Sequence, residues 1–305
     1  MAGLIRIFSK LCCAEKHHPE GKGEYFPEHS EAGRSGQASA YAYEETVAPT
    51  AAVFALSGAR RLGGPGAAGG LEEHPEEVLP NGARYTGQWT RDGAHRHGHG
   101  CLIRPDGCRY EGAFLASCAH GHGVFTEANG SQYEGQWDRD RKHGFGRYVH
   151  IDGTCYEGEW NMDAKSGRGT ESWNDGAKYE GEFYHGNKHG VGIYRAGDGV
   201  QYEGQFRNDL MDGEGCYHFA GGRTYTGQWQ AGHMTGLGRM DFPNGSAYEG
   251  SYEKDKKHGE GTLLWPDGHM YRGQWVRGKQ DGEGVLVDIH GVEQRGHWRD
   301  GQQLS

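Results

Sequence analysis

The sequence has little of what a thick globular core or a membrane span requires. Only 34% of its 305 residues are apolar, against the ~45–50% that is typical when glycine is included. No apolar run reaches the roughly 18 residues of a transmembrane helix. Basic residues are outnumbered, with 32 Lys and Arg against 42 Asp and Glu, whereas nucleic-acid-binding domains are usually basic. We therefore predict a thin-cored chain with no membrane-spanning helix and no nucleic-acid partner.

Cysteines are few and show no pairing pattern. There are seven, an odd number, and none are spaced as the C-x-x-C pair of a metal site. Unpaired thiols are typical of a reducing compartment. We therefore predict a cytoplasmic chain whose cysteines are free: Cys12, Cys13, Cys101, Cys108, Cys118, Cys155 and Cys216.

Glycine and aromatic residues, in contrast, are abundant, with 56 Gly, 17 Tyr, 10 Phe and 8 Trp. Nine tyrosines recur, the first step being 25 residues and every later step 23. A glycine follows each tyrosine by two positions and an aromatic residue follows it by four. A Gly-x-Gly pair comes next, and several units close on a pair such as Asn129-Gly130. Self-similarity at a fixed period indicates a repeat protein.

The spacing within a unit predicts two β-strands. A tyrosine, a glycine and an aromatic residue at steps of two lie on one face of a strand, whereas residues such as Glu134 and Gln136 point to the other. The Gly-x-Gly-x-apolar segment has the same period and predicts the partner strand; Glu171 breaks its apolar position in the fourth unit. Asn-Gly and Asp-Gly pairs predict two-residue hairpin turns, because both residues tolerate positive φ. Glycine inside a strand allows close approach, here by neighbouring rings.

At this point the sequence resembles a known family. The run Y-E-G-Q-W-D-R-D-R-K-H-G-F-G-R-Y from Tyr133 to Tyr148 is similar to the MORN (membrane occupation and recognition nexus) motif, and nine units match at fixed phase. The resemblance implies an all-β fold, an elongated single-layer antiparallel sheet of stacked β-hairpins with a groove along one face. A tenth, degenerate unit with Gln294 in place of tyrosine is expected to cap the array.

Composition divides the chain into three parts. We expect the array over residues 78–301 and a disordered linker over residues 21–77, which is rich in glycine and acidic residues. Residues 1–20 are a candidate membrane-anchoring segment, because Cys12 and Cys13 follow apolar and basic residues and suit lipidation. An inert tail and a targeting peptide are the two alternatives for this segment.

Two rows of side chains are candidate binding groups. Four lysines recur just before the histidine that ends the loop between the two strands of a unit, or before Ser166 in its place: Lys142, Lys165, Lys188 and Lys257. They form a candidate anionic-lipid row or, alternatively, a solvated edge that discourages aggregation. The motif rings are expected to be chiefly structural and to line the groove in which an extended or helical partner segment would lie: Tyr85, Trp89, Tyr110, Phe114, Tyr133, Trp137, Tyr156, Trp160, Tyr179, Phe183, Tyr202, Phe206, Tyr225, Trp229, Tyr248, Tyr271 and Trp275.

No pattern of catalysis or cofactor binding is present. The Gly-x-Gly pairs lack the G-K-[ST] and the helix of a phosphate loop, and no G-x-S-x-G or H-E-x-x-H occurs. His95, His97 and His99 alternate along the chain, a spacing that could place zinc ligands on one face of a strand. However, His97 and His120 occupy the loop-end position, where the family carries histidine without a metal. We therefore expect no enzyme, cofactor or metal.

These observations favour a scaffold that docks a protein partner on the repeats, at a membrane or the cortical cytoskeleton. Two alternatives follow from the resemblance. One is a regulatory module of a phosphatidylinositol-phosphate kinase-like system; the other is direct phospholipid binding by the repeats, against which 25 basic and 31 acidic residues after position 80 argue. Homodimerisation is a further expectation, because an open sheet leaves an unpaired edge.

Overall fold

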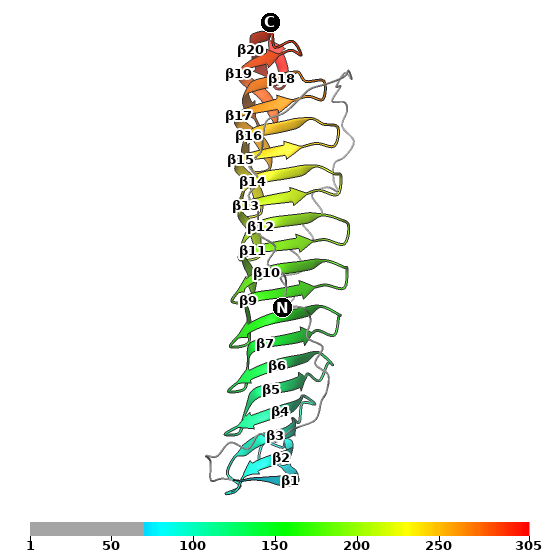
Figure 1. Cartoon of the computed structure of the whole chain (residues 1–305), viewed down its shortest axis with the longest axis vertical. Coiled ribbons are helices and arrows are strands. Elements are labelled where there is room, and N and C mark those ends of the chain that lie inside the picture. The colour runs from blue at the N-terminus through cyan, green and yellow to red at the C-terminus, as the bar shows by residue number, and fades with distance from the viewer. Residues whose placement is uncertain (1–69, 305) are drawn as a thin grey trace.

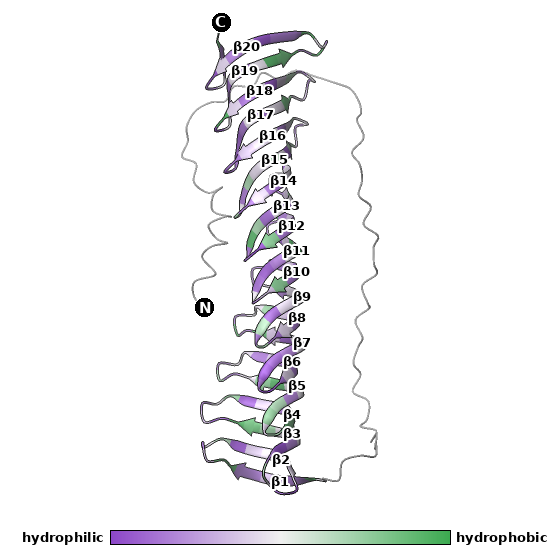
Figure 2. Cartoon of the chain, turned by 90° about the vertical axis from the view of Figure 1, so that its left-hand side faces the viewer, coloured by the Kyte–Doolittle hydropathy of each residue, from purple (hydrophilic) through white to green (hydrophobic). Residues whose placement is uncertain are grey.

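The computed structural model describes residues 70–304, which form one antiparallel sheet without a helix. Each strand pairs with the next along the chain, so that hairpins stack in sequence order from one end of the molecule to the other (Figure 1). A view turned by 90° shows the stack as a single layer (Figure 2). The fold class predicted from the sequence is therefore confirmed. Within the described residues there is no helix of the length and apolar character needed to cross a bilayer.

The sheet has 21 strands. Their bounds are β1 Leu71–Val78, β2 Arg84–Thr90, β3 Arg96–Ile103, β4 Arg109–Leu115, β5 Cys118–Thr126, β6 Gln132–Asp138, β7 Arg141–Val149, β8 Cys155–Asn161, β9 Ala164–Ser172, β10 Lys178–Tyr184, β11 Asn187–Arg195, β12 Gln201–Arg207, β13 Leu210–His218, β14 Thr224–Gln230, β15 His233–Asp241, β16 Ala247–Glu253, β17 Lys256–Leu264, β18 Met270–Val276, β19 Lys279–Val287, β20 Glu293–Arg299 and β21 Gln302–Leu304.

The tight turns lie at the opposite end of the hairpins from the one predicted. Arg139 and Asp140 join β6 to β7 with φ of 48° and 65°, as a type I′ turn requires. Asn129-Gly130 instead lies in the longer loop between β5 and β6, where Gly130 has a positive φ of 93°. There the Asn129 side chain accepts a hydrogen bond from the Ser131 N–H at 2.8 Å. The Asn-Gly and Asp-Gly pairs therefore lie in turns between strands, as predicted, but in loops longer than two residues in which only the glycine has a positive φ.

A straight row of glycines crosses the strands along the length of the stack. Gly135 pairs with Gly146, Gly146 with Gly158 and Gly158 with Gly169, so the register does not drift from one unit to the next. We call this row the glycine track. Its members are Gly87, Gly100, Gly112, Gly123, Gly135, Gly146, Gly158, Gly169, Gly181, Gly192, Gly204, Gly215, Gly227, Gly238, Gly250, Gly261, Gly273, Gly284 and Gly296.

The motif rings cover the track on one side of the sheet, which we call the aromatic face. The Tyr133 ring lies so close that a Cβ on Gly146 would come within 2.3 Å of its oxygen. Its hydroxyl donates a hydrogen bond to the carbonyl of Gln136 at 2.9 Å. The ring contacts Trp137 of its own unit and Trp160 of the next unit edge to face, with centroids 5.1 and 5.2 Å apart. Each unit therefore completes its neighbour's core, which makes stability cooperative along the array.

A β-bulge bends each hairpin from β2–β3 to β18–β19 beside the track. In β6 and β7 the register shifts between Gly135 and Trp137, and Gly144 adopts a φ of 61°. The Gln136 side-chain oxygen accepts a hydrogen bond from the Phe145 N–H at 2.8 Å, which satisfies a backbone donor that the bulge removes from the ladder. This capping explains the recurrent glutamine of the motif.

Both ends of the array extend further than the predicted bounds of 78 and 301. Residues 71–77, expected as linker, form most of β1, whose His74 pairs with Gly87 across a bulged register. This strand was not predicted, because it contains Pro75 and four glutamates. Such residues are typical of an edge strand. At the other end Trp298 is buried and packs edge to face on Tyr271 at 4.9 Å, so the predicted degenerate cap is present, followed by β21.

Candidate functional site: the open face and its trough

The sheet has a second face, opposite the rings, and we call it the open face. Its most regular feature is the residue between the two glycines of each Gly-x-Gly pair. These residues occupy the same register in every unit and all are exposed. We call them the slot row: His99, His122, Phe145, Arg168, Val191, Glu214, Leu237, Glu260 and Glu283.

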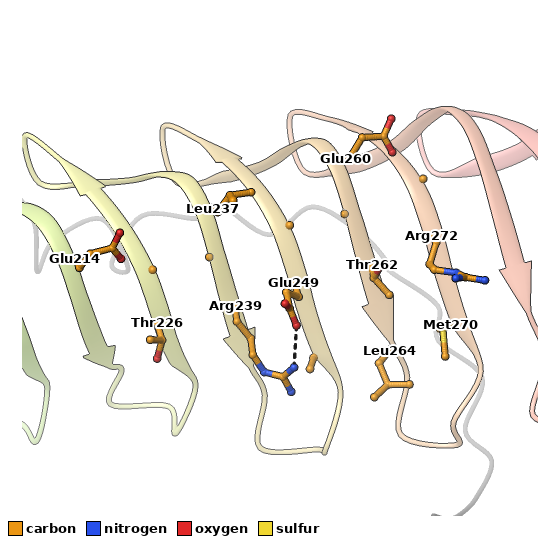
Figure 3. Close-up of a pocket in the computed structure, with 16 residues that line it drawn as sticks. Glu214, Thr226, Leu237, Arg239, Glu249, Glu260, Thr262, Leu264, Met270 and Arg272 are labelled. Carbon is orange, nitrogen blue, oxygen red and sulfur yellow. Dashed lines mark hydrogen bonds and ion pairs between the residues drawn. The ribbon is translucent and has the colours of Figure 1, made fainter. Parts of the chain in front are cut away.

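A trough runs beside the slot row, and glycine backbone forms its floor. Three hollows follow one another along it, of which two have volumes of about 890 and 970 Å³. In the hollow between β13 and β18, Leu237 and Glu260 stand on one side and Arg239, Glu249 and Arg272 on the other (Figure 3). The glycine track lies between them, because residues without side chains leave the space open.

The polar wall of the trough consists of linked charges. Arg239 contacts Glu249 at 3.2 Å across the strands, as the dashed line in Figure 3 marks. Farther along, Glu180 accepts from Lys178 and Arg195, each at 2.7 Å. The hydrogen bond from Lys178 lowers the pKa of Glu180, with Arg195 adding to the effect. Glu180 is therefore ionised at neutral pH, and the wall presents side chains of both signs of charge.

Large apolar side chains are exposed in the slot row at the third, fifth and seventh units. Phe145, Val191 and Leu237 have relative exposures of 56%, 58% and 65%. Single exposed apolar residues are ordinary on protein surfaces. These three, however, share one row, stand at a constant interval of two units and line the first two hollows. The alternation F-R-V-E-L-E at this position is visible in the sequence, but these residues were not predicted as a candidate site.

The motif aromatics that were expected to line a groove are instead the core of the array. Their exposures lie between 0 and 8%, and none of them lines any of the three hollows. The glycines of the track do line the trough, on the face of the sheet opposite the rings. The chiefly structural role predicted for the rings therefore agrees with their burial, and the exposed residues of the slot row are the groups that a partner can reach.

The four candidate lysines point onto the aromatic face rather than forming a solvated edge. The ammonium of Lys142 lies 4.6 Å from the Tyr148 ring centre and 5.2 Å from that of Trp160, within cation–π range. Lys257 sits in the same way over Tyr248 and Trp275. Burial lowers the pKa of Lys142. Such placement favours packing over contact with lipid phosphates.

Two of these lysines explain the break in the motif at Glu171. Lys188 is 5% exposed, and its ammonium lies 3.7 Å from the Asp209 carboxylate. Burial lowers the Lys188 pKa, whereas Glu171 and Asp209 raise it. Glu171 itself forms an ion pair with Lys165. A carboxylate replaces the usual apolar residue at this point because two neighbouring cations must be balanced where solvent is partly excluded.

The remaining candidate groups give no further site. Among residues 70–304 no three His, Cys, Asp or Glu side chains are arranged as a metal site. The five cysteines of this part of the chain are free thiols. The candidate lipidation residues Cys12 and Cys13, and the rest of segment 1–20, lie outside the described residues.

A stack of hairpins in which every unit packs its ring on the next defines a β-repeat protein, a class whose extended surfaces serve as binding modules. The chain belongs to the MORN-repeat family. The MORN repeat matches nine times in succession, at residues 85–109, 110–132, 133–155, 156–178, 179–201, 202–222, 225–247, 248–270 and 271–288. The comparison with curated proteins finds no match.

Solved structures give only distant likenesses. The chain is similar to a variant of the TCP10 domain of CPAP from Danio rerio, with 13% identity over 74% of this chain and 100% of that one, and a TM-score of 0.37. The TCP domain of SAS-4 from Drosophila melanogaster, solved with a proline-rich motif of Ana2, is 12% identical over 70% of this chain and 95% of that one, with a TM-score of 0.29. At such low identities and TM-scores these likenesses assign no function.

Proposed function

We propose that the chain is a non-catalytic scaffold that docks a segment of a protein partner in the trough of its open face. The observation that carries this proposal is the row of Phe145, Val191 and Leu237, more than half exposed on an array whose motif rings are buried. Apolar anchors with a polar surround are typical of protein docking surfaces. The glycine floor lets a partner backbone approach the sheet closely.

The non-catalytic part of the proposal rests on the uses already found for the repeated side chains. The tyrosine hydroxyls donate to backbone carbonyls, the glutamines cap bulges, and the lysines pack on rings. A nucleophile paired with a base, which covalent catalysis needs, is not among these recurrent contacts.

Selection of a random-peptide library on the full chain tests this function. The selected peptides are then measured on the triple variant Phe145→Glu/Val191→Glu/Leu237→Glu, which changes exposed side chains only. A matched control is Ile151→Glu, whose side chain is 64% exposed in a loop outside the slot row. We expect the selected peptides to lose about tenfold or more in affinity on the triple variant and to keep it on Ile151→Glu. Equal binding to all three proteins would refute docking in the trough.

We further propose that the scaffold acts at a membrane or the cortical cytoskeleton, with acylated Cys12 and Cys13 as the anchor. Two acyl chains bind a bilayer firmly, whereas one is marginal. Localisation of a full-length chain tagged at its C-terminus, beside Cys12→Ser/Cys13→Ser, tests this. A diffuse double mutant would support the anchor, and an unchanged location would assign the targeting to the array or its partner.

A further inference from the structure

The repeat length of the array restricts the conformation of its occupant. Each unit adds two strands, so that equivalent residues of successive units are ~9.6 Å apart at ~4.8 Å per strand. Because the glycine track is directly paired from strand to strand, the slot row advances by this distance without a sideways shift. A partner segment that uses every slot must therefore present a side chain on the same side about every 9.6 Å.

One common backbone conformation has this period. A polyproline II helix has three residues per turn at ~3.1 Å each, a repeat of ~9.3 Å. A β-strand repeats every ~6.7 Å, and the nearest in-phase interval of an α-helix is seven residues, ~10.5 Å. From Phe145 to Glu260, five units apart, a polyproline II chain drifts by ~1.5 Å and an α-helix by ~4.5 Å. The drift of the polyproline II chain is smaller than the length of a side chain, whereas the drift of the α-helix is not.

The capping glutamines add polar groups suited to the same conformation. A polyproline II backbone makes no internal hydrogen bonds, so its carbonyls remain free to accept. Gln136 and Gln205 are each oriented by a hydrogen bond that their side-chain oxygen accepts from a bulge N–H. Among residues 70–304 the amide nitrogens of these two side chains have no acceptor at hydrogen-bond distance, whereas that of the equivalent Gln228 donates to the slot residue Glu214 at 3.1 Å. These fixed donors stand beside the slot row, as their pairing with neighbouring slots shows.

The charges of the slot row determine which kind of side chain of the occupant lies opposite each slot. From the third unit to the eighth the row reads Phe145, Arg168, Val191, Glu214, Leu237 and Glu260, all exposed. Apolar residues alternate with a cation and then with two anions. A complementary segment carries apolar residues at alternate turns, an acidic residue opposite Arg168 and basic residues opposite the two glutamates.

We propose that the trough recognises a protein segment in the polyproline II conformation, read at every third residue as apolar, acidic, apolar, basic, apolar, basic. This inference rests on the proposed docking function and names the chemical class of its partner. The glycine floor supports it, because a polyproline II chain is slender and its backbone can lie directly on the sheet. Specificity then comes from the slot row, while the rings of the other face keep the spacing constant.

Designed peptides test the proposal on the full chain by fluorescence anisotropy. The probe is Leu-Pro-Pro-Glu-Pro-Pro-Leu-Pro-Pro-Lys-Pro-Pro-Leu-Pro-Pro-Lys, together with its reversed sequence, because either chain direction fits the spacing. The first control exchanges Glu for Lys and Lys for Glu and keeps the length, the apolar residues and the conformation. The second carries the same six side chains at every seventh residue of an alanine-rich helix. We expect one direction of the probe to bind about tenfold more tightly than either control.

A charge exchange in the protein makes the test specific. Arg168→Glu/Glu214→Lys/Glu260→Lys alters exposed side chains and should reverse the preference between the probe and its charge-exchanged control. Tighter binding of the helical control, or no reversal in this variant, would overturn the polyproline II assignment. If library-selected peptides still bind in the trough in that case, the docking function stands alone. If neither those peptides nor the designed ones depend on the slot row, both proposals fall.

Discussion

Replacing one glycine of the track by alanine should destabilise the array far more than replacing a loop glycine of the same unit. A Cβ on Gly215 would come within 2.3 Å of the Tyr202 oxygen and 2.5 Å of two ring carbons. Tyr202 cannot move away easily, because it is 1% exposed and wedged edge to face between Phe206 and Trp229 at 5.1 and 5.4 Å. Overpacking of this kind typically costs ~1–3 kcal/mol.

Gly221 supplies the matched control. A Cβ there has no atom within 4 Å and its φ is not positive, so Gly221→Ala should change the free energy of unfolding by less than about 0.5 kcal/mol. Urea and thermal unfolding followed by tryptophan fluorescence would compare the two variants. For a domain of this size each kcal/mol corresponds to roughly 2–4 °C in Tm.

A double-mutant cycle identifies the cause of the loss. Tyr202→Leu removes the ring that the new methyl group would meet, so Gly215→Ala should cost much less in that background than in the original chain. Gly215→Ala as stable as the original, or fully additive losses in the double variant, would refute the idea that rings packed on glycine hold the array together.

Three further predictions follow from the same contacts. Burial raises the pKa of Tyr85 and of Tyr271 to about 12 from 10.0, so their contribution to stability is complete below pH 10 and lost as pH rises towards 12; absorbance at 295 nm should show their ionisation only with unfolding. Lys257→Met should keep the Tm within a few degrees, since Met234 fills the equivalent place, whereas Lys257→Glu should lower it by placing a carboxylate over rings. Asp163→Ala should cost ~0.5–1.5 kcal/mol in urea unfolding, because its carboxylate caps a backbone N–H of the preceding hairpin at 2.9 Å; no change would show that the turn caps contribute nothing.

The period of the sequence was enough to predict the hairpin array and the packing of rings on glycine. The period did not locate the tight turns, because Arg139 and Asp140 have positive φ although neither residue is a glycine. That turn is stabilised from the neighbouring unit, where the Ala119 N–H donates to the Asp140 carboxylate at 2.7 Å. Such contacts between units are invisible until the register of the stack is known.

The exposed row of the open face was harder to predict for a related reason. Alternation told which side chains share a face, but a single-layer sheet has two faces and composition favoured the aromatic one as the groove. The rings close that face by packing edge to face across units, for example Tyr133 on Trp160. Phe145, Val191 and Leu237 lie on the open face, where the glycine floor beside them leaves their side chains exposed.

The central claim, that a partner segment lies in the trough of the open face, is tested most directly by NMR chemical-shift mapping on the isotope-labelled full chain with a library-selected peptide. The account predicts that the largest shifts fall on the amides of Val191, Leu237 and Gly238, while the loop amide of Ile151 stays unchanged. Shifts confined to the aromatic face, around Lys142, or to the terminal strands β1 and β21 would contradict it.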